Sequence, residues 1–268
     1  MAQPNASPHY SASQIGMFSR CGEQYRRRYI VGDRLPPGVA AIRGTAFHEG
    51  ARTNFAQKVD SHEDLPADEI VASAVAMFDA QSRGELALTD DEEERGINAV
   101  LGEALDDTVR LARAHAKLQA PEYQPVLVEE RISIASGVSG IALDGVIDLA
   151  DDQQRVVDLK TKAKSPNADE ADKSTQLTVY SAMHLARTGK PASTLRLDVL
   201  VALKKDVKRV VLDTQRDATD YTALGHRIAA MHAAITAGNF VPAAPDSWAC
   251  SRNWCGFFTS CPFVNAKR

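Results

Sequence analysis

Two acidic residues and a lysine in the middle of the chain have the types and spacing of a metal-assisted hydrolytic site. Asp148 is followed ten residues later by Asp158-Leu159-Lys160, and residues 151–154 between them are turn formers. The apolar and β-branched flanks predict two strands joined as a hairpin. Strand alternation then places Asp158 and Lys160 on one face and Leu159 on the other. Two carboxylates on adjacent strands can hold a hard divalent cation, and a neighbouring ammonium suits a water or a phosphate oxygen.

A purely structural interpretation of this stretch stays open. Aspartate at the end of a strand is commonly a turn residue, and Asp-x-Lys on a strand commonly forms a solvated face. The same holds for two further motifs. Gly44 lies four residues before His48 on a predicted helix, and alone that histidine reads as a surface or core residue. Gln176 and Tyr180 share one face of another predicted helix, which alone is ordinary helix surface.

The composition is that of a globular protein. The 268 residues are 44% apolar and 25% charged, enough for one large domain or a core with an insertion. No apolar run approaches the roughly 20 residues that span a bilayer. Residues 1–8 lack the charged and apolar regions of a signal peptide, so we expect a cytoplasmic protein without a membrane partner.

The net charge of −4 neither indicates nor excludes a nucleic-acid-binding protein, because local basic patches matter more than the total. Three patches are candidates: the arginines at 26–28, the lysines within 160–164, and the basic residues within 204–209. Each can equally be a solvated charged face, and we favour that interpretation for the last of them.

The four cysteines are unevenly distributed. Cys21 stands alone near the start, whereas Cys250, Cys255 and Cys261 lie close together near the end. Structural disulfides are unlikely to persist in a reducing cytosol. A metal or cluster site fits this distribution better than four inert core thiols. Zinc readily accepts four thiolates and is the physical alternative to a cluster.

The pattern along the chain predicts an α/β arrangement, with a helical N-terminal half packed on a mixed sheet and later helices. Ser11 and Gln14 are spaced as a capping box, and the helical spacing of apolar residues continues to Tyr29. Further helices are expected over 45–58, 170–188 and 217–238. Another is expected after Pro66, with Val71, Val75 and Phe78 on its inner face. A long helix is expected over 92–119, with an inner face of Ile97, Leu101, Leu105 and Val109. Strands are expected over 126–134, 138–149, 155–161, 195–203 and 209–212.

Taken together, the motifs resemble the PD-(D/E)XK nucleases. The family's Gly-x-x-x-His motif ends here at His48, and its Gly-x-(Ile/Val)-Asp strand ends at Asp148. Its Asp-x-Lys-Thr motif begins at Asp158, and its Gln-x-x-x-Tyr motif ends at Tyr180. The first helix, with Cys21, is also similar. The order of these motifs resembles the RecB-like branch, which includes CRISPR-associated exonucleases, the AddB nuclease domain and phage exonucleases.

This resemblance implies one nuclease domain over residues 1–268 with a restriction-endonuclease-like core. Residues 1–120 would be the mainly helical N-terminal region, 121–238 the core sheet and helices, and 239–268 a cysteine-rich tail joined to Cys21. It also implies metal ligands: Asp148, Asp158, His48 and the backbone carbonyl of Leu159 would bind Mg²⁺ or Mn²⁺. Glu129 or Glu130 on the preceding strand is a weaker candidate.

The resemblance also assigns roles to the remaining motif residues. Lys160 would orient or deprotonate the attacking water and stabilise charge on the phosphate. Gln176 and Tyr180 would position the DNA strand or the lysine.

For the cysteines, the resemblance implies a structural 4Fe-4S cluster held by Cys21, Cys250, Cys255 and Cys261. The last two cysteines are separated by five residues, as in the family, whereas four residues separate Cys250 from Cys255, where two is more usual. Zinc remains the alternative occupant.

The function implied is a metal-dependent DNA exonuclease acting on single-stranded DNA or duplex ends in recombination, repair or phage DNA processing. One alternative is a CRISPR-associated nuclease that trims DNA for spacer acquisition. Another is a non-catalytic nucleic-acid-binding module that keeps the fold. The resemblance implies DNA as a partner, and a second copy of the chain and recombination or CRISPR proteins are further candidates.

Overall fold

The computed structural model describes residues 8–264. The chain divides into two compact units, each assembled from separate segments. The sheet unit comprises residues Pro36–Ile132 and Val146–Gln215, and the cysteine unit comprises Met1–Leu35, Ser133–Gly145 and Arg216–Arg268. The single domain expected over 1–268 stays a prediction. The N-terminal stretch used to argue against a signal peptide lies, up to residue 7, outside the described residues.

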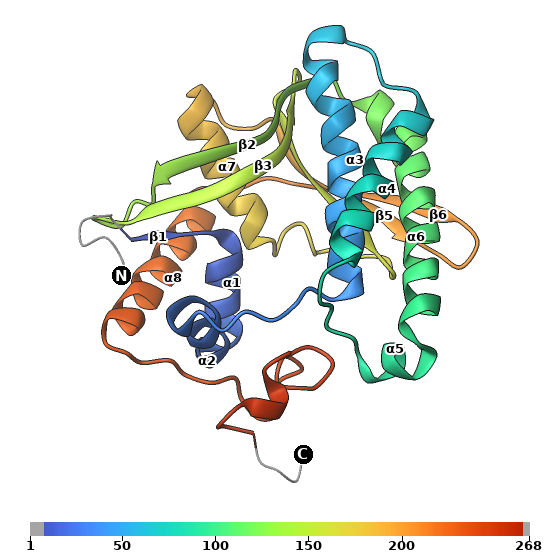
Figure 1. The fold of residues 1–268 in the computed structure, drawn as a ribbon. Coiled ribbons are helices and arrows are strands. Elements are labelled where there is room, and N and C mark those ends of the chain that lie inside the picture. The colour runs from blue at the N-terminus through green and yellow to red at the C-terminus, as the bar shows by residue number, and fades with distance from the viewer. Residues whose placement is uncertain (1–7, 265–268) are drawn as a thin grey trace. The chain divides into compact units, whose positions relative to one another are not determined.

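The sheet unit contains a mixed sheet flanked by helices, which confirms the expected α/β class (Figure 1). The order is β3-β4-β5-β6, with β2 paired to β3. The β3–β4 and β5–β6 pairs are antiparallel, and β4–β5 is parallel. The strands are β2 Pro125–Ala135, β3 Ala142–Asp151, β4 Arg155–Lys162, β5 Thr194–Ala202 and β6 Val207–Thr214.

Three long helices of this unit, α3, α4 and α6, pack against one another, and α7 packs on β4 and β5 (Figure 1). The helices are α3 Val39–Ser61, α4 Ala67–Ser82, α5 Asp90–Arg95, α6 Ile97–Ala114 and α7 Thr175–Thr188. A π-helix, His115–Gln119, and a 3-10 turn, Ala120–Glu122, extend α6. The helix predicted from residue 170 begins at Thr175. The Ser174 hydroxyl accepts the Leu177 N–H and caps α7 at this point.

One apolar cluster fixes α3 to the sheet. Phe47 and Phe55 of α3 pack with Leu149, Val157 and Leu159 of β3 and β4, all fully or almost fully buried. The inward position of Leu159 confirms the alternation predicted for its strand. Burial of each such side chain stabilises the fold by about 1.5–3 kcal/mol, so this contact sets the position of α3 on the sheet firmly.

The single helix predicted over 92–119 is wrong. Gly96 has a φ of +82°, outside the helical region, so α5 ends at Arg95 and α6 begins at Ile97. The inner face is also offset from the predicted stripe, since Ile97 is 44% exposed and Leu101 and Leu105 pack only at the margin. The buried residues of α6 are Val100, Ala104, Thr108, Leu111 and Ala112. Ala104 and Ala112 on this face are small, which favours close packing of α6 with α3 and α4.

The predicted face of α4 is shifted in a similar way. Its buried residues are Ile70, Ala74 and Phe78, whereas Val71 and Val75 are only partly buried. Gly50 of α3 explains the close packing, because a Cβ there would lie 3.0 Å from the Ile70 carbonyl oxygen.

The cysteine unit contains β1 His9–Tyr10, α1 Ala12–Arg20, α2 Gly22–Tyr25, a π-helix Arg26–Val31, α8 Ala218–Thr236 and a 3-10 turn Phe258–Ser260. The capping box is confirmed: the Gln14 N–H donates to the Ser11 hydroxyl and the Ser11 N–H to the Gln14 side chain. β1 pairs in parallel with the first residues of β3, and α1 packs on α2 and α8.

A glycine lets the C-terminal tail reach α2. The Gly22 N–H donates to the Val241 carbonyl at 2.8 Å, and a Cβ on Gly22 would lie within 2.9 Å of the backbone of residues 240 and 241. Any larger residue at position 22 would therefore push the tail away from the residue that follows Cys21.

Among the described residues, none of the helices has the length and apolarity that a bilayer crossing would need.

A buried histidine of the sheet unit makes stability depend on pH. His115 is fully buried against Phe47 and Phe55, and burial lowers its pKa to about 4. As the pH falls from about 6.5 toward 4, His115 is therefore protonated in the unfolded chain before it is protonated in the folded one. Its contribution to stability is fully present above this pH range and is lost within it.

Lowering the pH from 7 to 4.5 should reduce the free energy of unfolding of the wild type by about 2–3 kcal/mol more than that of His115→Phe, which keeps a ring in place. Urea unfolding at both pH values measures this difference. His226→Gln, at an exposed position, is the control and should behave as the wild type. Equal losses in His115→Phe and the wild type would contradict the assignment.

Candidate active site

The predicted hairpin between β3 and β4 is present. Leu149 pairs with Val157 in an antiparallel register, and the same register extended by one residue sets Asp148 against Asp158. The turn is held by Asp151, whose carboxylate accepts the backbone N–H groups of Gln153 and Arg155. The hairpin therefore brings together two carboxylates that lie ten residues apart in the chain.

Asp158 and Lys160 form an ion pair within this hairpin. The Lys160 Nζ lies 2.6 Å from the Asp158 Oδ1, and Asp158 is only 1% exposed. Burial raises the pKa of Asp158 to about 7; Lys160 opposes that shift and the charge of Asp148 adds to it. Burial lowers the pKa of Lys160, but the carboxylates of Asp158 and Asp148 outweigh it and raise the value overall. The pair thus holds its protons tightly.

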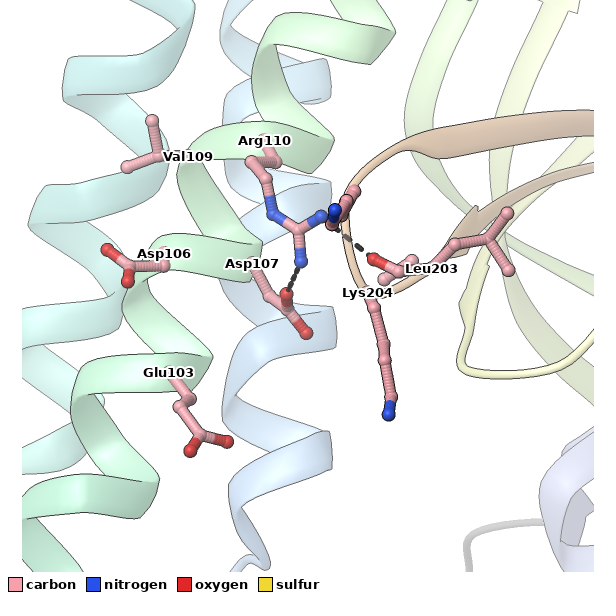
Figure 2. Close-up of a pocket in the computed structure, with 9 residues that line it drawn as sticks. Glu103, Asp106, Asp107, Val109, Arg110, Leu203 and Lys204 are labelled. Carbon is pink, nitrogen blue, oxygen red and sulfur yellow. Dashed lines mark hydrogen bonds and ion pairs between the residues drawn. The ribbon is translucent and has the colours of Figure 1, made fainter.

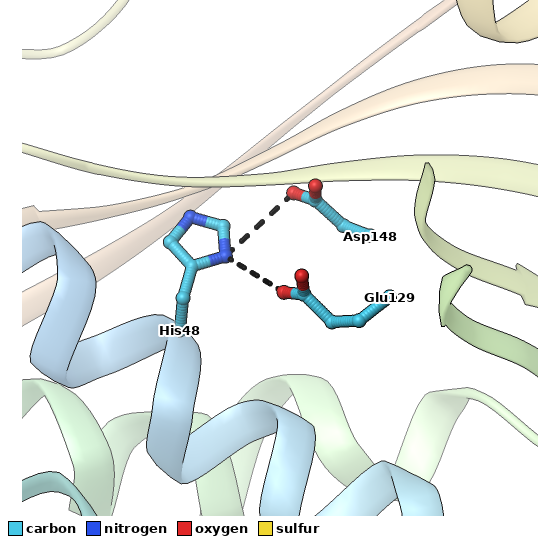
Figure 3. Close-up of side chains that lie close together, drawn as sticks. All are labelled: His48, Glu129 and Asp148. Atoms are coloured by element: carbon cyan, nitrogen blue, oxygen red, sulfur yellow. Dashed lines mark ion pairs between the residues drawn. The ribbon is translucent and has the colours of Figure 1, made fainter. Parts of the chain in front are cut away.

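His48 lies between two carboxylates, one from each of β2 and β3 (Figure 3). Its Nδ1 is 3.7 Å from the Glu129 Oε1 and 3.8 Å from the Asp148 Oδ2. Burial lowers the pKa of His48, but Glu129 and Asp148 outweigh it and raise the value overall. In the part of the chain that the structure describes, these three residues are the group whose ligand atoms lie within 4.8 Å of one another, a spacing that suits one metal ion.

A backbone irregularity in β2 carries Glu129 to this group. Glu129 has a φ of +49°, in the left-handed region that few residues other than glycine adopt. The buried positions Pro125 and Ile132 lie an odd number of residues apart, so the alternation shifts between them, as at a β-bulge. Glu130 is directed elsewhere, since its carboxylate accepts from Arg187 at 3.0 Å. Nothing in the sequence distinguished Glu129 from Glu130 as a ligand, and the backbone conformation of β2 does so.

Asp148 is held from two further directions. The Leu159 N–H donates to its Oδ2 at 3.0 Å, and the Tyr180 hydroxyl donates to its Oδ1 at 3.1 Å. The Gln176 side chain in turn donates to the Tyr180 oxygen at 2.6 Å. The helical spacing of Gln176 and Tyr180 therefore produces a chain of hydrogen bonds that ends on Asp148.

The predicted residues are thus close to one another but not equivalent. His48 and Asp148 share a group with Glu129, whereas Asp158 stands outside that group and pairs with Lys160. Leu159 buries its side chain in the apolar cluster and uses its N–H on Asp148. The part expected for its carbonyl stays a prediction.

The four cysteines lie in the cysteine unit and line one small cavity of about 30 Å³. The Cys21 sulfur accepts the backbone N–H groups of Gln24 at 3.4 Å and Ala243 at 3.3 Å. Burial raises the pKa of Cys255, and the charges of the other three cysteines add to that shift. Among the described residues, however, no three of these sulfur atoms lie within 4.8 Å of one another.

A larger hollow of about 710 Å³ lies between α6 and the β5–β6 turn (Figure 2). Arg110 spans it, donating to the Asp107 carboxylate and to the Leu203 carbonyl. Lys204 and Lys205 of the third basic patch line its rim and are exposed, and none of the predicted site residues lines it.

Comparisons with known proteins agree with this geometry. The family model for the PD-(D/E)XK nuclease superfamily matches residues 9–262. The chain belongs to the PD-(D/E)XK nuclease superfamily. This confirms the family inferred from the motifs and the assignment as a nuclease, while the RecB-like branch stays a prediction.

One solved structure supports the fold. A "Putative exonuclease" from Eubacterium rectale has a TM-score of 0.53 at 12% identity, over 91% of this chain and 87% of that one. An alkaline exonuclease from Laribacter hongkongensis has a TM-score of only 0.29 at 14% identity, over 72% of this chain and 93% of that one. No curated protein sequence matches the chain significantly.

The bulge at Glu129 generates a prediction about metal binding. We expect Glu129→Asn to weaken Mn²⁺ binding by about tenfold or more, because one carboxylate near His48 and Asp148 is lost. Asparagine tolerates a positive φ, so the unfolding midpoint should stay the same or rise. Calorimetric titration and thermal unfolding measure the two quantities.

Glu130→Gln is the matched control, since it removes the neighbouring carboxylate from its contact with Arg187. It should leave Mn²⁺ binding unchanged. If both variants bind Mn²⁺ as the wild type does, Glu129 does not contribute to a metal site.

Proposed function

We propose that the protein is a Mg²⁺- or Mn²⁺-dependent DNA exonuclease whose active site comprises His48, Glu129, Asp148, Asp158 and Lys160. The observation that carries this proposal is the convergence of three carboxylates, an imidazole and an ammonium from β2, the β3–β4 hairpin and α3. Oxygen and imidazole donors in one group suit these two cations, and the histidine favours manganese somewhat.

The electrostatics of the site support a resident cation. Asp158 is almost fully buried, and its pKa is raised to about 7, mainly by burial, although Lys160 opposes that shift. The carboxylates of Glu129, Asp148 and Asp158 lie around one ammonium and one imidazole, so further positive charge would stabilise them. A divalent ion held by His48, Glu129 and Asp148 would supply that charge and would polarise a phosphate oxygen and a water molecule. Asp158, facing Asp148, would complete the ligand set.

The raised pKa of Lys160 favours orientation of the attacking water over its deprotonation. An ammonium that holds its proton tightly is a poor base, but it can donate to the attacking water and to the phosphate as charge develops. We therefore assign Lys160 to orientation of the water and stabilisation of charge. Tyr180 would keep Asp148 in place by donating to its Oδ1, and Gln176 would hold Tyr180 by donating to the Tyr180 oxygen.

The substrate we propose is single-stranded DNA or the end of a duplex. The similar solved structure from Eubacterium rectale bears an exonuclease name, and the motif order favours the RecB-like branch. The cellular setting would be cytoplasmic, in recombination, repair or phage DNA processing, with CRISPR spacer acquisition as the alternative.

Replacing the active-site lysine tests the proposal. We expect Lys160→Ala to lower Mn²⁺-dependent cleavage of labelled DNA by roughly 100-fold or more, while DNA binding stays measurable by anisotropy. Lys164→Ala removes an exposed lysine from the same patch and should cleave as the wild type does. Full cleavage by Lys160→Ala would remove this lysine from the mechanism.

We further propose that the four cysteines hold a structural 4Fe-4S cluster. Their shared cavity and the two N–H groups on Cys21 suit thiolate ligands. Two thiolates on one zinc ion lie no more than about 4.6 Å apart, given bonds of about 2.3 Å. No three of the described sulfurs lie within 4.8 Å of one another, so a zinc ion would require them to move closer together. Such a cluster would close a loop of more than 200 residues between Cys21 and Cys250.

We expect anaerobically purified protein to be brown and to contain iron, and Cys255→Ser to lose the iron and to unfold at lower temperature. Elemental analysis and thermal unfolding measure both outcomes. Stoichiometric zinc without iron would overturn the cluster in favour of a zinc site.

A further inference from the structure

The chain has two tryptophans, and both are exposed on the cysteine-rich tail. Trp248 is 61% exposed and Trp254 is 68% exposed. Their rings meet edge to face, with centroids 5.3 Å apart and planes at 86°. Tryptophan is the largest apolar side chain, so two adjacent exposed indoles retain a large surface that a partner can cover.

The segment that carries these indoles is ordered by its own hydrogen bonds. The Cys250 N–H donates to the Ser247 carbonyl at 2.9 Å, and the Cys255 N–H donates to the Ser251 carbonyl at 2.9 Å. The Ser251 hydroxyl donates to the Trp248 carbonyl at 2.9 Å. Successive turns therefore hold the two tryptophans in place without burying them, and two of the four cysteines lie in the same turns. A surface held in this way loses little entropy when it binds a flat ligand.

The net charge of the cysteine unit favours a nucleic acid as the partner. Arg252 lies between them in the sequence and is exposed, with its guanidinium 5.9 Å from the Phe258 ring. Within residues 8–264, none of the ion pairs of the structure involves Arg252. The cysteine unit has ten Lys and Arg against six Asp and Glu, whereas the sheet unit has 21 against 29. The tryptophans thus lie on the unit with net positive charge.

Exposed aromatic rings, with an exposed arginine in the same segment, are features that bind unpaired bases. Each base has a flat face that stacks on an indole, and the guanidinium contacts the neighbouring phosphate. The bases of a duplex are already stacked on one another, so this surface discriminates in favour of single strands.

We propose that Trp248 and Trp254, together with Arg252, form a base-stacking platform for single-stranded DNA. The choice of DNA as the ligand rests on the proposed nuclease function. The platform itself is independent of the active-site chemistry, because all three residues belong to the cysteine unit and the proposed catalytic residues belong to the sheet unit.

Intrinsic fluorescence tests the platform directly, since the chain has no other tryptophan. The full chain is titrated with oligo(dT) in metal-free buffer, so that cleavage does not interfere. We expect saturable quenching by oligo(dT), little quenching by a strand of equal length that carries abasic sites, and little by a blunt duplex. The abasic strand keeps the phosphates, so it separates stacking from charge attraction.

Substitutions give the affinity change. We expect Trp254→Ala to weaken oligo(dT) binding at least about fivefold, the effect of losing one stacked base, and Trp254→Phe to restore most of it. Phe263→Ala, which removes an aromatic residue 58% exposed on the same tail, is the control and should bind as the wild type does.

Three results would overturn the platform: unchanged fluorescence when labelled oligo(dT) is bound, equal quenching by the abasic strand, or fluorescence that changes with protein concentration alone. The last would assign the tryptophans to contacts between copies. Cleavage that persists with no quenching would leave the nuclease proposal intact, and quenching without any cleavage would leave the platform intact.

Discussion

The arrangement of the candidate active site depends on the burial of carboxylates around Asp158. Its carboxylate is almost fully buried and faces Asp148 across the hairpin, with Lys160 as its close counter-charge. Removing a carboxylate from water is costly unless charge or hydrogen bonds compensate it. Burial and the neighbouring Asp148 raise the pKa of Asp158, and the ammonium of Lys160 opposes that shift. A divalent ion bound here, as we propose, would offset the carboxylate charge that Lys160 leaves unpaired.

The remaining contacts restrict where such an ion can lie. Asp148 accepts from Leu159 and from Tyr180, which fixes both carboxylate oxygens. His48 is placed by α3, whose Phe47 and Phe55 pack into the cluster beneath the hairpin. Glu129 arrives through a strained backbone position, and such strain persists where the surrounding structure imposes it. Site geometry and core packing therefore depend on the same hairpin and helix.

The cysteine unit has a different organisation. Its tail has little regular structure after α8, and it is held by the close approach at Gly22 and by short turns near the cysteines. A chain segment of this kind buries too little apolar surface to be stable on that basis alone. A cluster bound to all four thiols would supply the missing stabilisation and would also fix the turns that display Trp248 and Trp254.

The sequence by itself determined the local features of this protein. Alternation predicted the hairpin and the inward side of Leu159, the capping box predicted the start of α1, and the motif order predicted the nuclease family. These features depend on neighbouring residues, whose periodicity and hydrogen bonding are readable along the chain. The helix break at Gly96 was missed because glycine is tolerated within helices, so its positive φ is visible only in the fold.

Only the tertiary structure decided the long-range features. It selected Glu129 over Glu130 through a bulge, directed Tyr180 to Asp148, and paired Asp158 with Lys160. It also exposed both tryptophans, whose apolar character alone would predict burial. These contacts depend on which distant segments of the chain pack together. The packing of the whole chain determines this, and the spacing of residues along the sequence does not.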